Sequence, residues 1–66
     1  MSDVETVKAQ IKKLSAKAIQ AKMNLHDLSE DLPTNWTEIL AVAQKTYDAF
    51  AELEAKRGEL KALEAA

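Results

Sequence analysis

A single histidine among carboxylates is the part of this sequence best suited to chemistry. His26 is followed by Asp27, and Glu30 lies one helical turn further along the chain. An imidazole together with carboxylates can hold a divalent cation weakly, above all when a second subunit contributes ligands. The simpler interpretation is an exposed histidine that interacts with Glu30 across one turn. We favour this interpretation and keep His26 and Glu30 only as weak candidates for metal binding.

No residue pattern in the sequence is typical of an enzyme. The chain has no Cys and only one Gly, which excludes a thiol nucleophile and a glycine-rich phosphate loop. Spacing brings no Ser, His and acid together, and the carboxylates are scattered along charged helix faces, so nothing selects an acid/base pair. We therefore expect a protein that is not an enzyme, with no catalytic residues and no cofactor.

The first half of the chain carries a clear helical pattern. Nine apolar residues are spaced alternately three and four positions apart, which is typical of a helix packed along another helix, as in a coiled coil. Ser2 and Glu5 have the spacing of a capping box, so this helix should begin near residue 3. Pro33 disfavours helical dihedrals at the residue before it, which ends the helix at about residue 30. The nine residues are Val4, Val7, Ile11, Leu14, Ala18, Ala21, Leu25, Leu28 and Leu32.

A second helix should follow a short link, over about residues 35–63. A link of about residues 31–34 is short enough to turn this helix back antiparallel to the first. Its apolar face is broad, which suggests contact with two helices rather than one. Trp36 and Tyr47 are interpreted as residues of the core or its edge, with Trp36 packed under the bend. We expect a main stripe of Trp36, Ile39, Ala43, Thr46, Phe50, Leu53, Arg57 and Leu60, flanked by Leu40, Val42, Tyr47, Ala49 and Leu63.

The predicted fold is all-α, a single helical-hairpin domain of 66 residues. A chain this short rarely builds a sufficient core alone, and without disulfides or a clear metal site the usual remedy left is oligomerisation. Two hairpins can close a core as a Rop-like four-helix bundle, and a two-fold homodimer is the commonest closed solution. We expect its core to contain Val7, Ile11, Leu14, Ala18, Ala21, Leu25, Leu28, Ile39, Ala43, Phe50, Leu53 and Leu60.

The outer face of the first helix offers a candidate binding surface. Ile19 and Met23 lie one turn apart and off the apolar stripe, and His26 follows them on the same side. Two apolar side chains among small and polar ones make a modest exposed patch, and Met suits an adaptable contact. Ile19, Met23 and His26 are either ordinary surface or a docking site for a partner protein or a second dimer.

Charge is unevenly distributed along the chain, whose formal net charge is −2. Residues 1–24 have a balance of +3, and residues 25–54 have a balance of −6. The simpler interpretation is that these charges pair between neighbouring helices, and the alternative is an electrostatic docking face. No apolar run is long enough to span a bilayer and no signal peptide opens the chain, so we expect a cytoplasmic protein without membrane contact.

Two stretches carry a family resemblance. Residues 12–33 read KKLSAKAIQAKMNLHDLSEDLP, and residues 36–47 read WTEILAVAQKTY. With these stretches the chain resembles, from about Val4 to Leu63, the small Rop-like proteins encoded in bacterial nitrogen-fixation operons. The resemblance implies two helices joined by a four-residue link and a rod-like antiparallel dimer similar to the plasmid regulator Rop. It implies no catalytic residues, and the family has no established biochemical role.

Two classes of function are compatible with these observations. The first is a non-enzymatic accessory protein that binds another protein of the nitrogen-fixation system. The second is an RNA-binding regulator by analogy with Rop, in which paired first helices would present Lys8, Lys12 and Lys22 twice. Fold analogy is a poor guide to function, the net charge is negative, and no Arg or aromatic residue is interleaved with those lysines. We therefore favour the first class.

Overall fold

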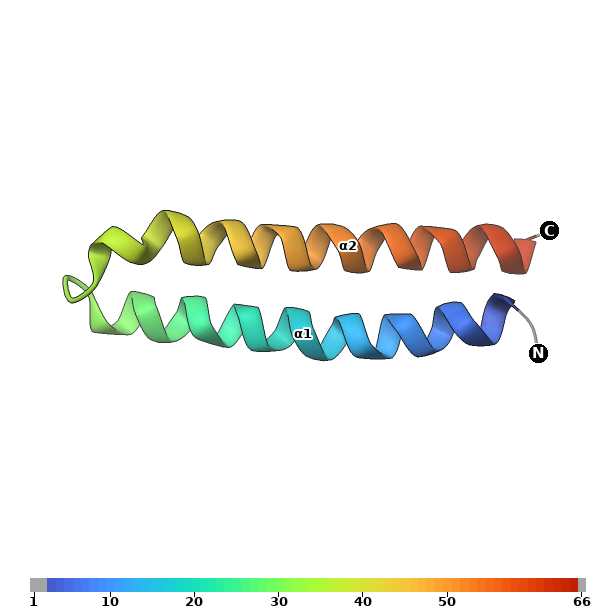
Figure 1. Ribbon diagram of the computed structural model, residues 1–66, viewed down its shortest axis with the longest axis horizontal. Coiled ribbons are helices and arrows are strands. Elements are labelled where there is room, and N and C mark those ends of the chain that lie inside the picture. The colour runs from blue at the N-terminus through green and yellow to red at the C-terminus, as the bar shows by residue number, and fades with distance from the viewer. Residues whose placement is uncertain (1–2, 66) are drawn as a thin grey trace.

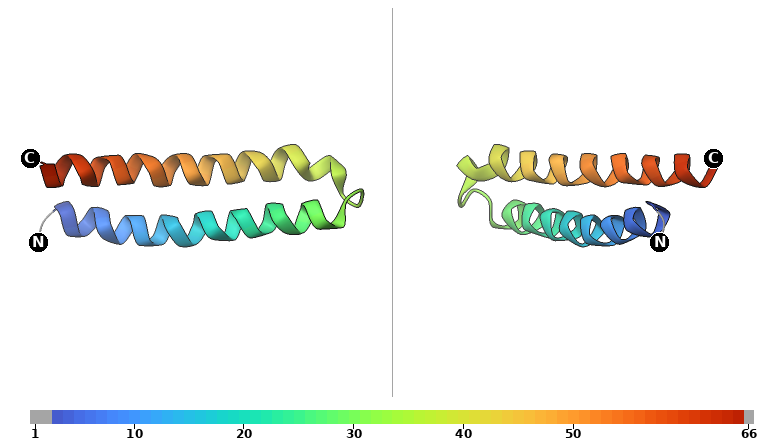
Figure 2. Two further views of the ribbon diagram at one scale, coloured as in Figure 1. Left: turned by 180° about the vertical axis from the view of Figure 1, so that it is seen from behind. Right: turned by 45° about the vertical axis from the view of Figure 1, so that its right-hand side comes forward.

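The protein is a long antiparallel hairpin of two helices. The computed structural model describes residues 3–65 and contains α1 (Asp3–Asp31), a 3-10 turn η1 (Trp36–Glu38) and α2 (Ile39–Ala65) (Figure 1). The helices lie side by side along their whole length in every view, in a rod of 49 × 14 × 12 Å (Figure 2). Residues 3–65 contain no strand. Ser2, the expected first residue of a capping box, lies outside the described residues.

The bend is made by residues 32–35 and closed by backbone hydrogen bonds. The Thr34 N–H donates to the Asp31 carbonyl at 2.9 Å, and the Trp36 N–H donates to the Pro33 carbonyl at 3.3 Å. Asn35 adopts the left-handed conformation with φ 59°, which Asn tolerates better than most residues. A helix cannot continue through that conformation. The α-helix therefore begins at Ile39, after η1, rather than at the expected residue 35.

The stripe expected on the first helix faces α2. Val7 and Ala18 are buried, and the other stripe residues from Val4 to Leu28 are half-buried. Leu32, the last residue of the stripe, lies beyond the end of α1 and is 41% exposed. The alternating spacing therefore identified the packed face of α1 correctly, up to the point where the helix stops.

The stripe expected on the second helix is rotated from the observed one. The face of α2 against α1 includes Ala49 and Leu53, each 3% exposed, whereas Trp36, Phe50 and Arg57 are exposed. Trp36 and Tyr47 are thus outside the core of the hairpin, contrary to the interpretation from sequence. Ala49 takes the central place because a small residue there lets the two helices approach closely. The residues buried or half-buried on α2 are Ile39, Val42, Ala43, Thr46, Ala49, Leu53, Lys56, Leu60 and Leu63.

Polar contacts also join the helices. The Thr46 hydroxyl lies 3.2 Å from the Ala21 carbonyl of α1 and 2.9 Å from the Val42 carbonyl of its own helix. Lys17 and Glu52 form an ion pair at 3.8 Å, and Lys8 and Glu64 form one at 3.9 Å. Ion pairs as exposed as these contribute little to stability. The hairpin is therefore held mainly by its apolar contacts.

The small-residue contact at the middle of the hairpin can be tested by overpacking. Ala18 is fully buried in a cluster with Ala49 and Leu53, so Ala18→Leu should push the helices apart and lower the free energy of unfolding by roughly 1–3 kcal/mol. Ala16→Leu, at an exposed position of the same helix, is the matched control and should change it by less than about 0.5 kcal/mol. Chemical denaturation followed by circular dichroism measures both. Equal stabilities of the two variants would contradict the close contact.

Candidate interaction surfaces

The two long sides of the hairpin differ in chemistry, and their residues can be assigned from the helix geometry. Lys17 precedes the buried Ala18 by one residue and Ile19 follows it, so at about 100° per residue they flank opposite edges of the packed face. On α2, Asp48 and Phe50 flank Ala49 in the same way. Lys17 and Asp48 both line one groove between the helices. Ile19 and Phe50 therefore lie on the side away from that groove.

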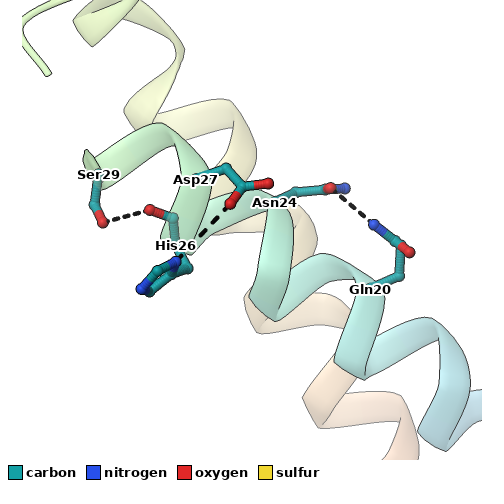
Figure 3. A network of polar contacts seen from close by, with 5 residues as sticks. All are labelled: Gln20, Asn24, His26, Asp27 and Ser29. Atoms are coloured by element: carbon teal, nitrogen blue, oxygen red, sulfur yellow. Dashed lines mark hydrogen bonds and ion pairs between the residues drawn. The ribbon is translucent and has the colours of Figure 1, made fainter. Parts of the chain in front are cut away.

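The groove side is polar. The groove measures about 620 Å³, and its apolar lining consists of Ala21, Val42 and Ala49. Its polar lining is paired to a large extent within the chain. Gln20 donates to Asn24 at 3.0 Å, as Figure 3 shows, and Gln44 donates to the lining residue Asp48 at 2.8 Å. The Lys17–Glu52 ion pair joins one lining residue from each helix.

The opposite side carries a row of exposed apolar residues on η1 and α2, here called the aromatic face and defined as Trp36, Leu40, Tyr47 and Phe50. Their exposed fractions are 64%, 82%, 72% and 38%. Spacings of seven and three residues keep Leu40, Tyr47 and Phe50 on one side of α2, and Trp36 precedes them in η1. Sequence reasoning missed this surface because it placed these residues in or beside the core. The signal that identifies it is the uninterrupted three-and-four spacing through Val42, Ala49 and Lys56, which leaves the aromatic residues outside.

The three candidate residues on α1 are exposed. Ile19 and Met23 are 56% and 53% exposed, and the His26 side chain is 69% exposed. Met23 lies two residues from the packed positions Ala21 and Leu25, which places it opposite α2. Ile19 instead lies at the edge of α1 that continues toward the aromatic face. Ile19 and Met23 are four residues apart and point only about 40° apart, so they lie on neighbouring parts of the outer face of α1.

The setting of His26 differs from the expected one. Its Nδ1 lies 3.9 Å from a carboxylate oxygen of Asp27, not of Glu30, and Ser29 donates to the His26 carbonyl at 2.7 Å (Figure 3). Within residues 3–65 no three His, Cys, Asp or Glu residues are grouped so that they could hold a metal ion. A metal site at His26 and Glu30 would need ligands from another molecule.

Comparison with known proteins identifies the family. The sequence matches the Rop-like family over residues 2–65, nearly the whole chain. The chain belongs to this Rop-like family. A UPF0437 protein of Azorhizobium caulinodans is 71% identical over 98% of this chain and 94% of its own length, and one of Sinorhizobium fredii is 55% identical over 97% and 96%. The resemblance inferred from residues 12–33 and 36–47 is thereby confirmed.

Two further relatives bear on context and fold. A UPF0437 protein of Frankia alni, described as lying in the nifX-nifW intergenic region, is 47% identical over 77% of this Rop-like chain and 62% of its own length. A structure determined by NMR at the Northeast Structural Genomics Consortium is 48% identical and superposes with a TM-score of 0.90, covering 98% of this chain and 92% of the other. The hairpin is therefore shared by a solved relative.

Neither helix within residues 3–65 is long and apolar enough to cross a membrane.

The exposure of Met23 leads to a prediction about stability. Met23→Glu should leave helicity and the free energy of unfolding within about 0.5 kcal/mol of the native chain, because the new carboxylate stays in water. Leu53→Glu is the matched control, since it buries a charge beside Ala18 and should unfold the hairpin. Thermal melts followed by circular dichroism distinguish the two. If Met23→Glu also unfolds the chain, Met23 belongs to a packed interface.

Proposed function

We propose that this protein is a non-enzymatic accessory protein of nitrogen fixation that acts by binding another protein, and that it works as a homodimer in which two hairpins form a four-helix bundle. The gene context of the Frankia alni relative supports the link to nitrogen fixation. The aromatic face carries the rest of the proposal, because it is a row of large apolar side chains that the hairpin itself leaves uncovered.

The size of the core supports dimerisation. The buried apolar residues among those described are Val7, Ala18, Ala49 and Leu53, and none of the larger side chains is fully buried. A single hairpin of this length is expected to be marginally stable, because the area it removes from water is small relative to the entropy lost on folding. A second hairpin packed on the Phe50 part of the aromatic face and on Ile19 would cover Phe50 and complete the core. The broad apolar face of α2 would then contact one helix of each copy.

The distribution of charge favours an antiparallel arrangement of the two copies. Residues 23–44, around the bend, contain four carboxylates and no Lys or Arg. The opposite end, residues 3–17 and 54–65, contains seven Lys or Arg and five Asp or Glu. An antiparallel dimer places each acidic bend beside the more basic end of the other copy, whereas a parallel dimer would bring the two acidic bends together.

Dimerisation through the aromatic face makes a prediction about Phe50. Sedimentation equilibrium should give about twice the chain mass of 7.3 kDa, and the melting temperature should rise with protein concentration. Phe50→Ala should destabilise the dimer by roughly 2–5 kcal/mol per site and raise its dissociation constant. Tyr47→Phe, which keeps the ring and removes only an exposed hydroxyl, is the control and should do neither.

Either of two results would contradict this arrangement. A chain that stays monomeric and fully helical at low micromolar concentration needs no second copy. A Phe50→Ala variant with native dimer mass and native dissociation would place the dimer interface elsewhere.

The binding role itself can be tested in nitrogen-fixing cells. The tagged chain should copurify with a defined protein partner, and this partner should stay bound after ribonuclease treatment, since the proposed contact is protein to protein. Met23→Glu and His26→Ala should reduce recovery of the partner if the outer face of α1 makes the contact, whereas the exposed Ala16→Ser should not. Release of the partner by ribonuclease would favour the RNA-binding alternative.

A further inference from the structure

We propose that the bend end of the hairpin is a docking surface for a basic segment of another protein, anchored on Trp36. This tip surface consists of Leu32, Trp36 and Leu40 together with the carboxylates of Asp31 and Glu38. The proposal rests on the antiparallel dimer of the proposed function, which leaves the tip open, and it goes further by naming the chemistry of the partner.

The apolar part of the tip is large and held on an ordered backbone. Leu32, Trp36 and Leu40 are 41%, 64% and 82% exposed. Three main-chain hydrogen bonds hold the bend, including one from the Glu38 N–H to the Asn35 carbonyl at 2.9 Å. A binding surface on a fixed backbone loses little conformational entropy when it binds. Exposed Trp is also the residue type most enriched among side chains that dominate binding energy.

The carboxylates of the tip form no ion pairs among residues 3–65, unlike four glutamates of α2. In the second half of α2, Glu52, Glu54, Glu59 and Glu64 each form an ion pair with a Lys or Arg. Within residues 3–65 no ion pair involves Glu30, Asp31 or Glu38. The nearby Asp27 forms an ion pair with His26 at 3.9 Å. The negative charge around Trp36 is therefore uncompensated, and it selects a partner that brings Lys or Arg.

A second copy of the chain does not cover this surface in the antiparallel arrangement. The midpoint of α2 (Ile39–Ala65) is residue 52, so a two-fold axis there sets Phe50 opposite position 54 of the other copy. By the same register Leu40 faces position 64 of α2, whereas Trp36 belongs to η1 (Trp36–Glu38) and lies outside the paired α2 helices. In this register no α2 residue of the second copy lies opposite Trp36, which stays exposed near Asp31 and Glu38 in the sequence.

The complementary partner is a helix or loop with an apolar side chain flanked by Lys or Arg. The apolar side chain would pack on Trp36 and Leu40, while the cations would approach Asp31 and Glu38. Oppositely charged rims speed association and reject acidic surfaces, and the apolar centre supplies most of the affinity. Binding of this kind weakens with added salt, which screens the attraction between the partner's cations and the carboxylates of Asp31 and Glu38.

The chain provides its own probe, because Trp36 is its only Trp. We would titrate the full-length protein with a helical peptide of roughly four turns, with Leu along one face and Lys along the other, and follow Trp fluorescence. The matched probe is the same peptide with every Lys replaced by Glu. The basic peptide should give a saturable blue shift that weakens with added salt, and the acidic peptide should give none.

Variants separate the tip from general attraction between opposite charges. The double variant Asp31→Lys, Glu38→Lys should weaken binding of the basic peptide at least tenfold. The control reverses two carboxylates away from the tip, Asp3→Lys and Asp48→Lys, with the same change in net charge, and should weaken binding less than threefold. Leu40→Gln should weaken binding at least threefold with no change in net charge.

Three results would overturn the proposal: no fluorescence change with the basic peptide, equal responses to both peptides, or equal losses in the tip and control double variants. Sedimentation of the same samples reports on the dimer independently. A monomer that still binds the basic peptide would contradict the homodimer of the proposed function and leave the tip site standing.

Discussion

The close contact between small residues at the middle of the hairpin determines where every other large side chain can lie. Ala18 is completely buried against Ala49 and Leu53, with Ile11, Leu14 and Ala21 packed around them. Two helices that meet through Ala residues approach closely, and a bulky aromatic ring at the centre of the contact would separate them. Phe50 and Tyr47, beside Ala49 on α2, are therefore excluded from the contact with α1. Their exposure follows from the close packing of the two helices.

The sequence predicts the two helices unequally well, for a reason that can be traced to particular residues. On α1 only one set of positions is apolar at alternating spacing, so the packed face was identified correctly. On α2, Ile39, Thr46, Leu53 and Leu60 fit two different stripes. Trp36 and Phe50 complete one stripe, whereas Ala49 and Lys56 complete the other. Hydrophobicity alone favours the stripe with Trp36 and Phe50, but the short distance between the helices favours the stripe with Ala49. Lys56 fits the second stripe because its alkyl chain can pack while its amine reaches Glu59 at 3.1 Å.

The bend shows a different limit of sequence reasoning. Pro33 correctly indicated that the first helix stops, but no pattern predicted that Asn35 would take a left-handed conformation and that η1 would precede α2. Local turn chemistry depends on backbone hydrogen bonds that compete with one another over a few residues. That local structure matters for the candidate sites, because it holds Trp36 outside the core. An error of four residues in the start of a helix thus changed the interpretation of the most distinctive side chain.

In a dimer both stripes of α2 can be packed, each against a different helix. A helix in a four-helix bundle has two neighbours, and its inward arc is wide enough to include both Ala49 and Phe50, which differ by only about 100°. In the proposed dimer the Ala49 stripe contacts α1 of the same chain, and the Phe50 part of the aromatic face contacts the other copy. Assembly would then use the middle of the rod, where the charges are paired between helices. Recognition would be left to the ends of the rod, where Trp36 is exposed and where Asp31 and Glu38 form no ion pair among residues 3–65.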